Sequence, residues 1–162
     1  MLQRKVCLIG SFAVGKTSLL QRFVYSRFSD KYLTTVGVKI DRKIVPTPQG
    51  SVSLILWDLA GEDEFQSLQT SYLRGGAGFI VVIDCTRNET LQQAQTHLDY
   101  LDEEHPDAAK VVFVNKIDLE NSWDLEASDL QRLERKYKVF QTSAKTGNTA
   151  EEAFHALAEA MA

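Results

Sequence analysis

Short apolar runs alternate along this chain with longer segments in which apolar residues recur every three or four positions. A near-continuous apolar run between helical segments is typical of a buried parallel strand. The pattern therefore predicts an α/β protein, a mainly parallel sheet with helices on both faces. The predicted strands are residues 6–9, 52–57, 79–83, 111–114 and 139–140, and the predicted helices lie at about 17–25, 90–104, 129–137 and 150–161.

One connection departs from this alternation. Residues 39–45 and 51–57 flank the turn Pro46-Thr47-Pro48-Gln49-Gly50, and a short turn with proline and glycine suits an antiparallel hairpin. We therefore expect a six-stranded sheet with five parallel strands and one antiparallel edge strand. The glycine-rich segment 75–78 is expected to begin a strand, and 162 residues suit a single domain over 1–162.

Composition and charge are those of an ordinary globular protein. The 44% hydrophobic and 25% charged fractions exclude a disordered chain. Net charge is −4, from 18 basic and 22 acidic residues, which disfavours nucleic acid as a partner. Cys7 and Cys85 lie in apolar runs without metal-binding spacing and predict small buried side chains in a reducing compartment. With no signal peptide, membrane span or lipidation motif, we expect a cytoplasmic monomer without a lipid anchor.

A phosphate-binding motif occupies residues 10–17. Gly-Ser-Phe-Ala-Val-Gly-Lys-Thr fits G-x-x-x-x-G-K-[ST] between a predicted strand and a predicted helix. In that context, consecutive backbone N–H groups and the helix N-terminus can bind phosphate. Lys16 can place its charge between the two terminal phosphates, and the Thr17 hydroxyl can ligate Mg²⁺. The motif predicts nucleotide binding and leaves the base and the reaction open.

A second motif, Asn115-Lys116-Ile117-Asp118, follows the predicted strand 111–114. Parallel sheets bind ligands at the carboxyl ends of their strands. Asp118 can accept two hydrogen bonds from the ring N–H and the exocyclic amine of guanine, a donor pair that adenine lacks. Lys116 can lay its aliphatic stem along the purine, and Asn115 can tie this segment to the phosphate loop. Four residues alone are a weak signal, but behind a phosphate loop they indicate guanine.

These motifs stand in one order with Asp58-Leu59-Ala60-Gly61 and Ser143-Ala144-Lys145. In that order the chain resembles the Ras superfamily of small GTPases over essentially its whole length. The segments 34–38, Thr-Thr-Val-Gly-Val, and 71–75, Ser-Tyr-Leu-Arg-Gly, resemble its Rab branch, as does Trp57-Asp58. The resemblance implies a P-loop G domain that switches between GTP and GDP with Mg²⁺.

The resemblance also implies individual nucleotide contacts. It places Phe28 edge-on against guanine and the Ala144 N–H on the guanine oxygen, with Ser143 and Lys145 in support. Phe28 could instead be a core aromatic at a helix exit. Further implied contacts are Ala13, Val14, Gly15, Ser18 and Tyr32.

Two segments are expected to sense the γ-phosphate. The resemblance gives Thr35 a hydroxyl on Mg²⁺ and an N–H on the γ-phosphate, and gives Gly61 a second N–H on that phosphate. Asp58 can hold a metal-bound water at the end of its strand. Loss of the γ-phosphate would release these contacts and change the surface. The plainer alternatives are a turn hydroxyl for Thr35 and a helix cap for Asp58.

Two residues depart from the family pattern. Glu62 stands where most members carry the water-positioning glutamine, so with Lys16, Thr35 and Gly61 it completes the expected catalytic set. A carboxylate keeps the acceptor, loses the donor and adds negative charge, yet it is a better proton acceptor. Phe12 stands where Ras has glycine and would occupy the space of a partner's arginine. Alternatively, Glu62 belongs to a solvated acidic run and Phe12 packs under a switch.

Two functions remain open. The first is a slow GTP-hydrolysing switch, and the second is a hydrolysis-deficient module that stays GTP-loaded. Asp118 and the few basic residues disfavour a third, a small-molecule kinase. The resemblance implies effectors, exchange factors and GTPase-activating proteins at a switch face, with contact to membranes through such partners. This face is centred on Ile40, Trp57 and Tyr72, where Rab proteins carry Phe, Trp and Tyr.

Overall fold

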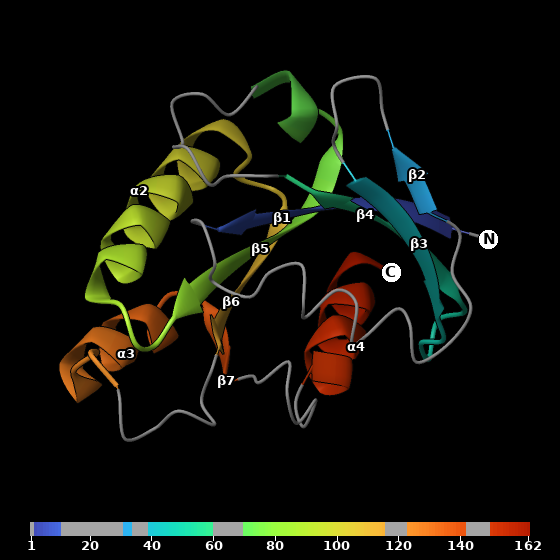
Figure 1. The fold of residues 1–162 in the computed structure, drawn as a ribbon. Coiled ribbons are helices and arrows are strands. Elements are labelled where there is room, and N and C mark those ends of the chain that lie inside the picture. Colours follow the sequence, from blue (N-terminus) through green and yellow to red (C-terminus); the bar gives the residue numbers. More distant parts are fainter. Residues whose placement is uncertain (1, 11–30, 34–38, 60–69, 116–122, 142–149) are drawn as a thin grey trace.

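A seven-stranded sheet in the order β2-β3-β4-β1-β5-β6-β7 forms the centre of the structure (Figure 1). The structure, a computed structural model, describes residues 2–10, 31–33, 39–59, 70–115, 123–141 and 150–162. The strands are β1 (Leu2–Gly10), β2 (Lys31–Leu33), β3 (Lys39–Val45), β4 (Val52–Asp58), β5 (Gly76–Asp84), β6 (Ala109–Asn115) and β7 (Lys138–Gln141).

The strand directions confirm the mainly parallel sheet and the antiparallel hairpin. β1 pairs in parallel with β4 and β5, β5 with β6, and β6 with β7, whereas β3 runs antiparallel to β4. The six expected strands are therefore present, and β5 begins within the glycine-rich segment as predicted. β2 adds a strand of 3 residues outside β3, so β3 is not the edge. A strand this short is below the 4–8 residues over which alternation can be recognised.

The turn between β3 and β4 explains one glycine. Thr47 and Gly50 exchange backbone hydrogen bonds of 3.2 and 3.0 Å, which close the turn. Gly50 adopts a φ of 119°, which residues with a Cβ atom rarely adopt. The glycine that helped to predict the hairpin is thus a residue that the backbone of its turn requires.

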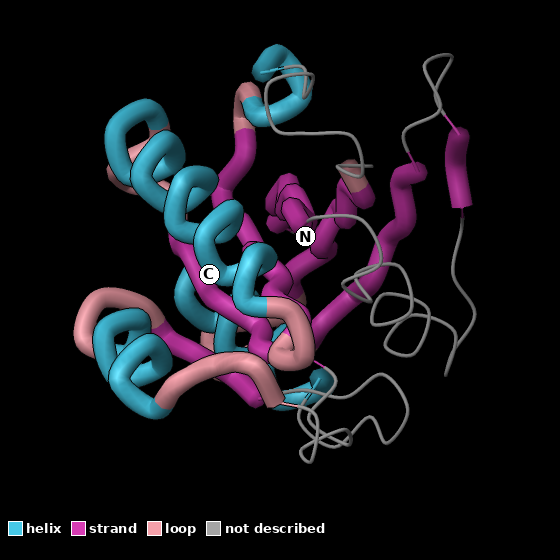
Figure 2. Tube along the Cα trace, turned by 60° about the vertical axis from the view of Figure 1, so that its left-hand side comes forward, coloured by secondary structure: helices cyan, strands magenta, loops and turns pink. Residues whose placement is uncertain are grey.

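Helices cover both faces of the sheet, as predicted. α2 (Asn88–Glu104) and α3 (Ala127–Glu134) pack on one face and α4 (Ala150–Met161) on the other (Figures 1 and 2). The helix predicted at 17–25 lies outside the described residues. Among the helices that the structure describes, none is long and apolar enough to cross a membrane.

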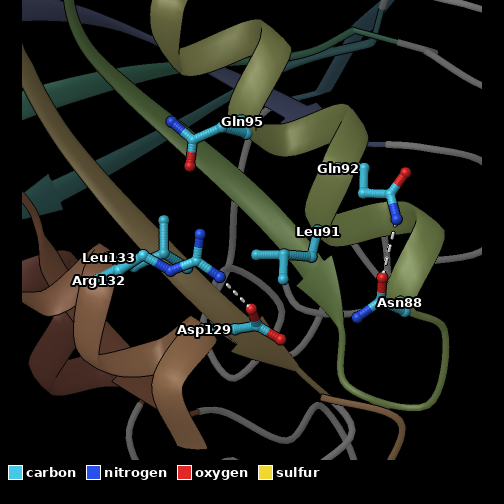
Figure 3. Close-up of a pocket in the computed structure, with 7 residues that line it drawn as sticks. All are labelled: Asn88, Leu91, Gln92, Gln95, Asp129, Arg132 and Leu133. Atoms are coloured by element: carbon cyan, nitrogen blue, oxygen red, sulfur yellow. Dashed lines mark hydrogen bonds and ion pairs between the residues drawn. The ribbon is translucent and has the colours of Figure 1, made fainter. Parts of the chain in front are cut away.

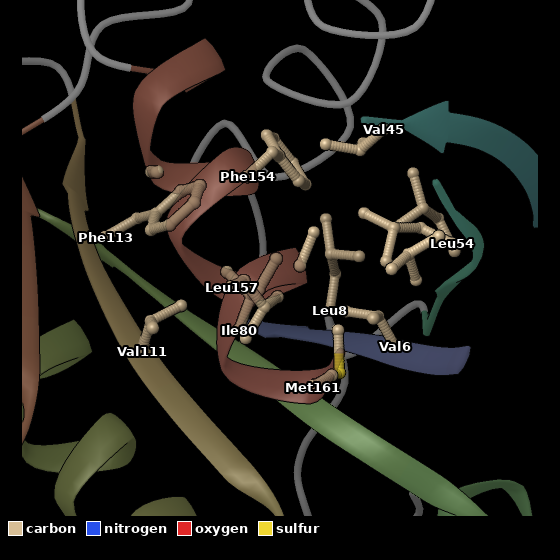
Figure 4. Packing of buried hydrophobic residues seen from close by; sticks show 14 of the residues in the cluster. Val6, Leu8, Val45, Leu54, Ile80, Val111, Phe113, Phe154, Leu157 and Met161 are labelled. Atoms are coloured by element: carbon tan, nitrogen blue, oxygen red, sulfur yellow. The ribbon is translucent and has the colours of Figure 1, made fainter. Parts of the chain in front are cut away.

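The core under α4 is built from edge-to-face aromatic rings and aliphatic side chains (Figure 4). The Phe113 ring of β6 lies 5.6 Å from that of Phe154 on α4 and 6.1 Å from that of Phe140 on β7. A Cβ atom on Gly78 would lie 2.8 Å from Met161 Sδ, so this glycine allows α4 to approach β5. The aromatic contacts and this close approach fix α4 against the sheet.

Both cysteines are fully buried, which confirms their expected role as small core side chains. Burial raises the pKa of the Cys7 thiol to about 12. The reactive thiolate form of Cys7 is therefore strongly disfavoured in the folded protein at neutral pH.

Candidate functional site

Several polar strand ends meet at the carboxyl edge of the parallel sheet. In the strand register, Leu8 of β1 lies beside Asp58 of β4, and Asp84 of β5 lies beside Asn115 of β6. Gly10, the first residue of the phosphate motif, ends β1 between β4 and β5. The structure thus brings the start or end of three predicted motifs to one edge, where such sheets bind ligands.

Asp58 is the described member of the predicted metal set. It ends β4 and is buried, and the following Leu59 N–H donates to Leu8 O at 3.3 Å. The backbone is thus fixed on the residue that follows, and the Asp58 carboxylate offers the hard oxygen that Mg²⁺ prefers, directly or through water. No group of three His, Cys, Asp or Glu residues able to hold a metal occurs in the described ranges. The further ligands expected of Thr17 and Thr35 lie outside those ranges.

Asn115 ends β6 and is held by the backbone of β5. The N–H of Cys85 donates to Asn115 O at 3.2 Å. Asp84, just before Cys85, is buried and shapes the turn that follows β5. Its carboxylate accepts hydrogen bonds from Thr86 N at 2.9 Å and Thr86 Oγ1 at 2.6 Å, and pairs with Arg87 Nε at 3.1 Å. Asn115 is therefore fixed at the edge where the guanine motif begins.

Most predicted nucleotide and catalytic residues lie outside the described residues, and their roles stay predictions. Tyr32 is placed by its backbone in β2, opposite Ile40. The residues outside the described ranges are Phe12, Ala13, Val14, Gly15, Lys16, Thr17, Ser18, Phe28, Thr35, Gly61, Glu62, Lys116, Asp118, Ser143, Ala144 and Lys145.

The structure brings Ile40, Trp57 and Tyr72 together beside Asp58. Ile40 and Trp57 are cross-strand neighbours on β3 and β4, and the Trp57 ring lies 6.2 Å from that of Tyr72, in the short helix Thr70–Leu73. All three side chains are half-buried against the core under α2. Trp57 does not lie on an edge strand, because β4 pairs with both β3 and β1.

Lys5 is a member of this cluster that the sequence did not reveal. Its Nζ lies 3.8 Å from the Trp57 ring centroid and donates to Arg74 O at 2.8 Å. Burial lowers the pKa of this ammonium group. A cation this close to an indole face is attracted by the ring. Lys5 is far from Trp57 in the sequence, so no local pattern could indicate the contact.

A groove of about 270 Å³ lies between α2 and α3 (Figure 3). One wall carries amide side chains of α2, the other carries an ion pair of α3, and leucines form the floor. These residues are Asn88, Gln92 and Gln95, Asp129 and Arg132, and Leu91 and Leu133. Asn88 is the first residue of α2, so the groove begins next to the turn after β5.

Comparisons with known proteins support the family that the order of the sequence motifs indicates. The family model described as "Ras family" matches residues 5–162. Ras-related protein Rab-13 of Rattus norvegicus is 32% identical over 157 residues, which cover 95% of this chain and 77% of the relative. GTP-binding protein YPTM1 of Zea mays is 34% identical over 160 residues, 97% of this chain and 77% of the relative. Ras-related protein Rab-10 of Diplobatis ommata is 33% identical over 158 residues, which cover 96% of this chain and 79% of the relative.

Proposed function

This chain belongs to the Ras family as a Rab-like, GTP-binding small GTPase, and from that premise we propose that residues 1–162 form one G domain whose nucleotide controls partner binding. The domain binds GTP or GDP with Mg²⁺, hydrolyses GTP slowly and acts as a monomer in the cytoplasm. The observation that carries the proposal is the family match over residues 5–162, supported by Gly10, Asp58 and Asn115 at one edge of the sheet.

The proposed nucleotide site spans that edge. The loop after β1 holds the phosphates through its backbone and Lys16, because consecutive N–H groups suit phosphate oxygens. Thr17, Thr35 and a water on Asp58 surround the Mg²⁺, which neutralises charge between the terminal phosphates. Beyond β6, Asp118 accepts both donors of guanine. Each of these residues is assigned a role that its side chain can perform and that the matching position has in the family motif.

We propose a slow hydrolysis rate because of two residues near the γ-phosphate. Glu62 lacks the amide donor of glutamine and places negative charge beside the triphosphate. Phe12 takes up space that an arginine from a GTPase-activating partner would need. The same two residues favour a second candidate function, a module that stays GTP-loaded and does not turn over. Both candidates share the nucleotide site and differ in the fate of GTP.

The proposed output is protein binding at the face formed by Ile40, Trp57 and Tyr72, with Lys5 against Trp57. Large aromatic side chains that are half-buried and well packed are frequent anchors of interfaces. Trp57 precedes Asp58 directly, so the end of β4 carries both a member of this cluster and the proposed Mg²⁺ residue. Effectors, exchange factors and activators would bind there, and such partners would bring the protein to membrane surfaces.

The decisive experiment identifies the nucleotide released when the purified protein is denatured, and then follows one turnover of bound GTP. GDP in the released pool together with slow GTP decay is the expected result. Retained GTP without decay would favour the GTP-loaded module. Released ADP or ATP, or ATP affinity within tenfold of GTP affinity, would contradict both functions.

Exchange of the base-reading carboxylate provides a sharper test of the guanine site. In Asp118→Asn the amide presents one donor and one acceptor, which match xanthine instead of guanine. The variant is expected to lose GTP affinity and gain affinity for xanthosine triphosphate, measured by competition against a fluorescent nucleotide. Asp107→Asn, an exposed carboxylate in the turn after α2, is the control and should keep the wild-type preference. An unchanged preference in Asp118→Asn would remove Asp118 from base recognition.

A further inference from the structure

The backbone of Cys85 holds both ends of the segment that follows β6. Its N–H donates to Asn115 O at 3.2 Å, and its carbonyl oxygen accepts from Asp124 N–H at 2.8 Å. Asn115 and Asp124 enclose residues 116–123, which carry Lys116 and Asp118. The end of β5 therefore fixes the distance between the two ends of the segment that the proposed function assigns to guanine.

Asp124 also joins this segment to the start of α2. Its Oδ2 accepts from Asn88 N–H at 2.9 Å, and its carbonyl oxygen accepts from Asn88 Nδ2 at 3.3 Å. The preceding residue, Arg87, makes no side-chain capping hydrogen bond within the described part of the chain. The carboxylate of Asp124 thus caps the N-terminus of α2, although Asp124 is distant from this helix in the sequence. Its negative charge also suits a helix N-terminus.

A second amide contacts the side chain of Asn88. Gln92 Nε2 donates to Asn88 Oδ1 at 3.0 Å on the wall of the groove between α2 and α3 (Figure 3). With Oδ1 occupied by a donor, Nδ2 is the atom that faces Asp124 O. Rotating the amide by 180° would place its NH₂ group against the Gln92 donor and its oxygen against the Asp124 oxygen. The carbonyl oxygen of Asp124 can only accept, so it sets this orientation of Asn88, and the Gln92 amide complements it.

The other end of this chain of contacts rests on the buried carboxylate of Asp84. Asp84 accepts from Thr86 and pairs with Arg87 Nε, and its carbonyl oxygen accepts from Arg87 N–H at 3.0 Å. These contacts shape the turn that presents the Cys85 N–H and carbonyl groups. A residue held by a rigid turn and a helix start can position a neighbouring site more accurately than an unsupported loop.

We propose that Asp124 is a positioning residue for guanine recognition. The contacts that fasten Asp124, which follows segment 116–123, to Cys85 and to the start of α2 restrict the segment that carries Asp118, and this preorganises that segment for guanine. The proposal rests on the proposed function, because it takes Asp118 as the base-reading group. Preorganisation of this kind lowers the ordering cost of binding, so its loss appears mainly as faster release.

Release of the ribose-labelled nucleotide into excess unlabelled nucleotide measures this effect. In Asp124→Ala, release of GDP and of GTP should each become faster by about three- to tenfold, as expected for the loss of the one hydrogen bond that the Asp124 side chain accepts, from Asn88 N–H. Both rates should change by the same factor, because the two nucleotides share the base. Asn88→Ala should act in the same direction, and Asp124→Asn, which keeps an acceptor, should lie closer to wild type.

Base selectivity separates positioning from a purely structural role. Inosine lacks the exocyclic amine of guanine, so it can use only one of the two hydrogen bonds to Asp118. The preference for GTP over ITP should therefore fall in Asp124→Ala and partly recover in Asp124→Asn. If Asp124 were only a cap for α2, the melting temperature would fall while this preference stayed at the wild-type value, and that outcome would overturn the proposal.

Controls make the result interpretable. Asp99→Ala removes an exposed carboxylate of α2 that accepts from Gln95, away from Asp124, and should leave release rates and selectivity unchanged. If Asp124→Ala does not fold, Asn88→Ala and Asp124→Asn carry the test below their melting temperatures. Wild-type release and selectivity in these variants would overturn the proposal. A wild-type protein without guanine preference would instead refute the proposed function.

Discussion

His97 is a buried side chain of α2, and burial lowers the pKa of its imidazole to about 4. An unperturbed histidine has a pKa of about 6.5, so the unfolded chain binds more protons than the folded protein between these values. Stability should therefore fall as the pH drops from about 6.5 to 4, by up to about 3 kcal/mol from this group. His97 is neutral in the folded protein at physiological pH.

Denaturant unfolding between pH 7 and pH 4.5 tests this assignment. His97→Leu removes the group and should flatten the pH dependence, whatever its effect on stability at pH 7. His155→Leu, a half-buried histidine of α4 paired with Glu151, is the matched control and should keep more of the wild-type slope. A His97→Leu slope equal to that of wild type would show that His97 does not account for the acid sensitivity.

Individual site residues differ in how far the sequence could identify them. Asp58 and Asn115 were predicted correctly as strand-end residues, because each follows an apolar run directly. Lys5 and Asp124 were missed, because they act through contacts with residues that are far away in the chain, Trp57 and Asn88. Pairing of this kind depends on strand order, which no local pattern contains.

Asp102 connects α2 to two other segments. Its Oδ2 accepts from the Tyr137 hydroxyl and pairs with Lys136 Nζ at 3.0 Å, and its Oδ1 pairs with Lys110 Nζ of β6 at 3.3 Å. Burial alone raises the pKa of Asp102, but hydrogen bonds from Tyr137, Lys136 and Lys110 outweigh it and lower the pKa below its ordinary value. The folded protein therefore favours the charged carboxylate.

Asp102→Ala should lower the free energy of unfolding at pH 7 by about 1–3 kcal/mol, because it removes several hydrogen bonds to one charged group. Its side chain is 27% exposed, so solvent screening places the effect toward the lower value. This contribution should be present above the ordinary aspartate pKa and disappear as the pH falls through the lowered one. Urea unfolding of Asp102→Ala beside Asp99→Ala measures it, and equal stabilities would contradict the role of Asp102.

Element boundaries show where local signals were sufficient. The helix predicted at 150–161 and the strand at 39–45 coincide with α4 and β3. The helix predicted at 129–137 is α3, Ala127–Glu134, because Glu126 and Asp129 form a capping box that starts it earlier. Glutamate is not among the preferred N-cap residues, so this start was not recognisable. The chain leaves the helix after Glu134 to reach β7 at Lys138.

The two faces of the sheet give the molecule two different environments beside the proposed phosphate site. α4 seals one face, whereas Ile40, Trp57 and Tyr72 stay half-buried on the other. β1 connects this second face to the phosphate motif. Cys7 lies beside Trp57 in the strand register, its Sγ lies 3.7 Å from Tyr72 O, and Gly10 ends the same strand. β1 therefore joins the first residue of the phosphate motif to the aromatic cluster.

Trp57→Ala should weaken nucleotide-dependent partner binding by about 2 kcal/mol or more if Trp57 is an anchor of the interface. Nucleotide affinity should stay near that of wild type, since Asp58 and the segments proposed to bind the nucleotide are unaltered. The measurement is capture of partners by the protein loaded with a non-hydrolysable GTP analogue, with the GDP-loaded protein as reference. A partner that is recovered with wild type in the GTP form is then titrated against the variant.

Ile44→Ala is the matched control for this experiment. Ile44 lies on the same face of β3 as Ile40, is 46% exposed and lies opposite Ser53, farther from Asp58. Its truncation also removes apolar surface from this hairpin, yet it should cost much less binding, because interface energy concentrates in a few packed anchors. Equal capture of the same partners by wild type and Trp57→Ala would refute the aromatic cluster as the docking surface. Equal losses in Trp57→Ala and Ile44→Ala would move the surface along the hairpin, away from the nucleotide.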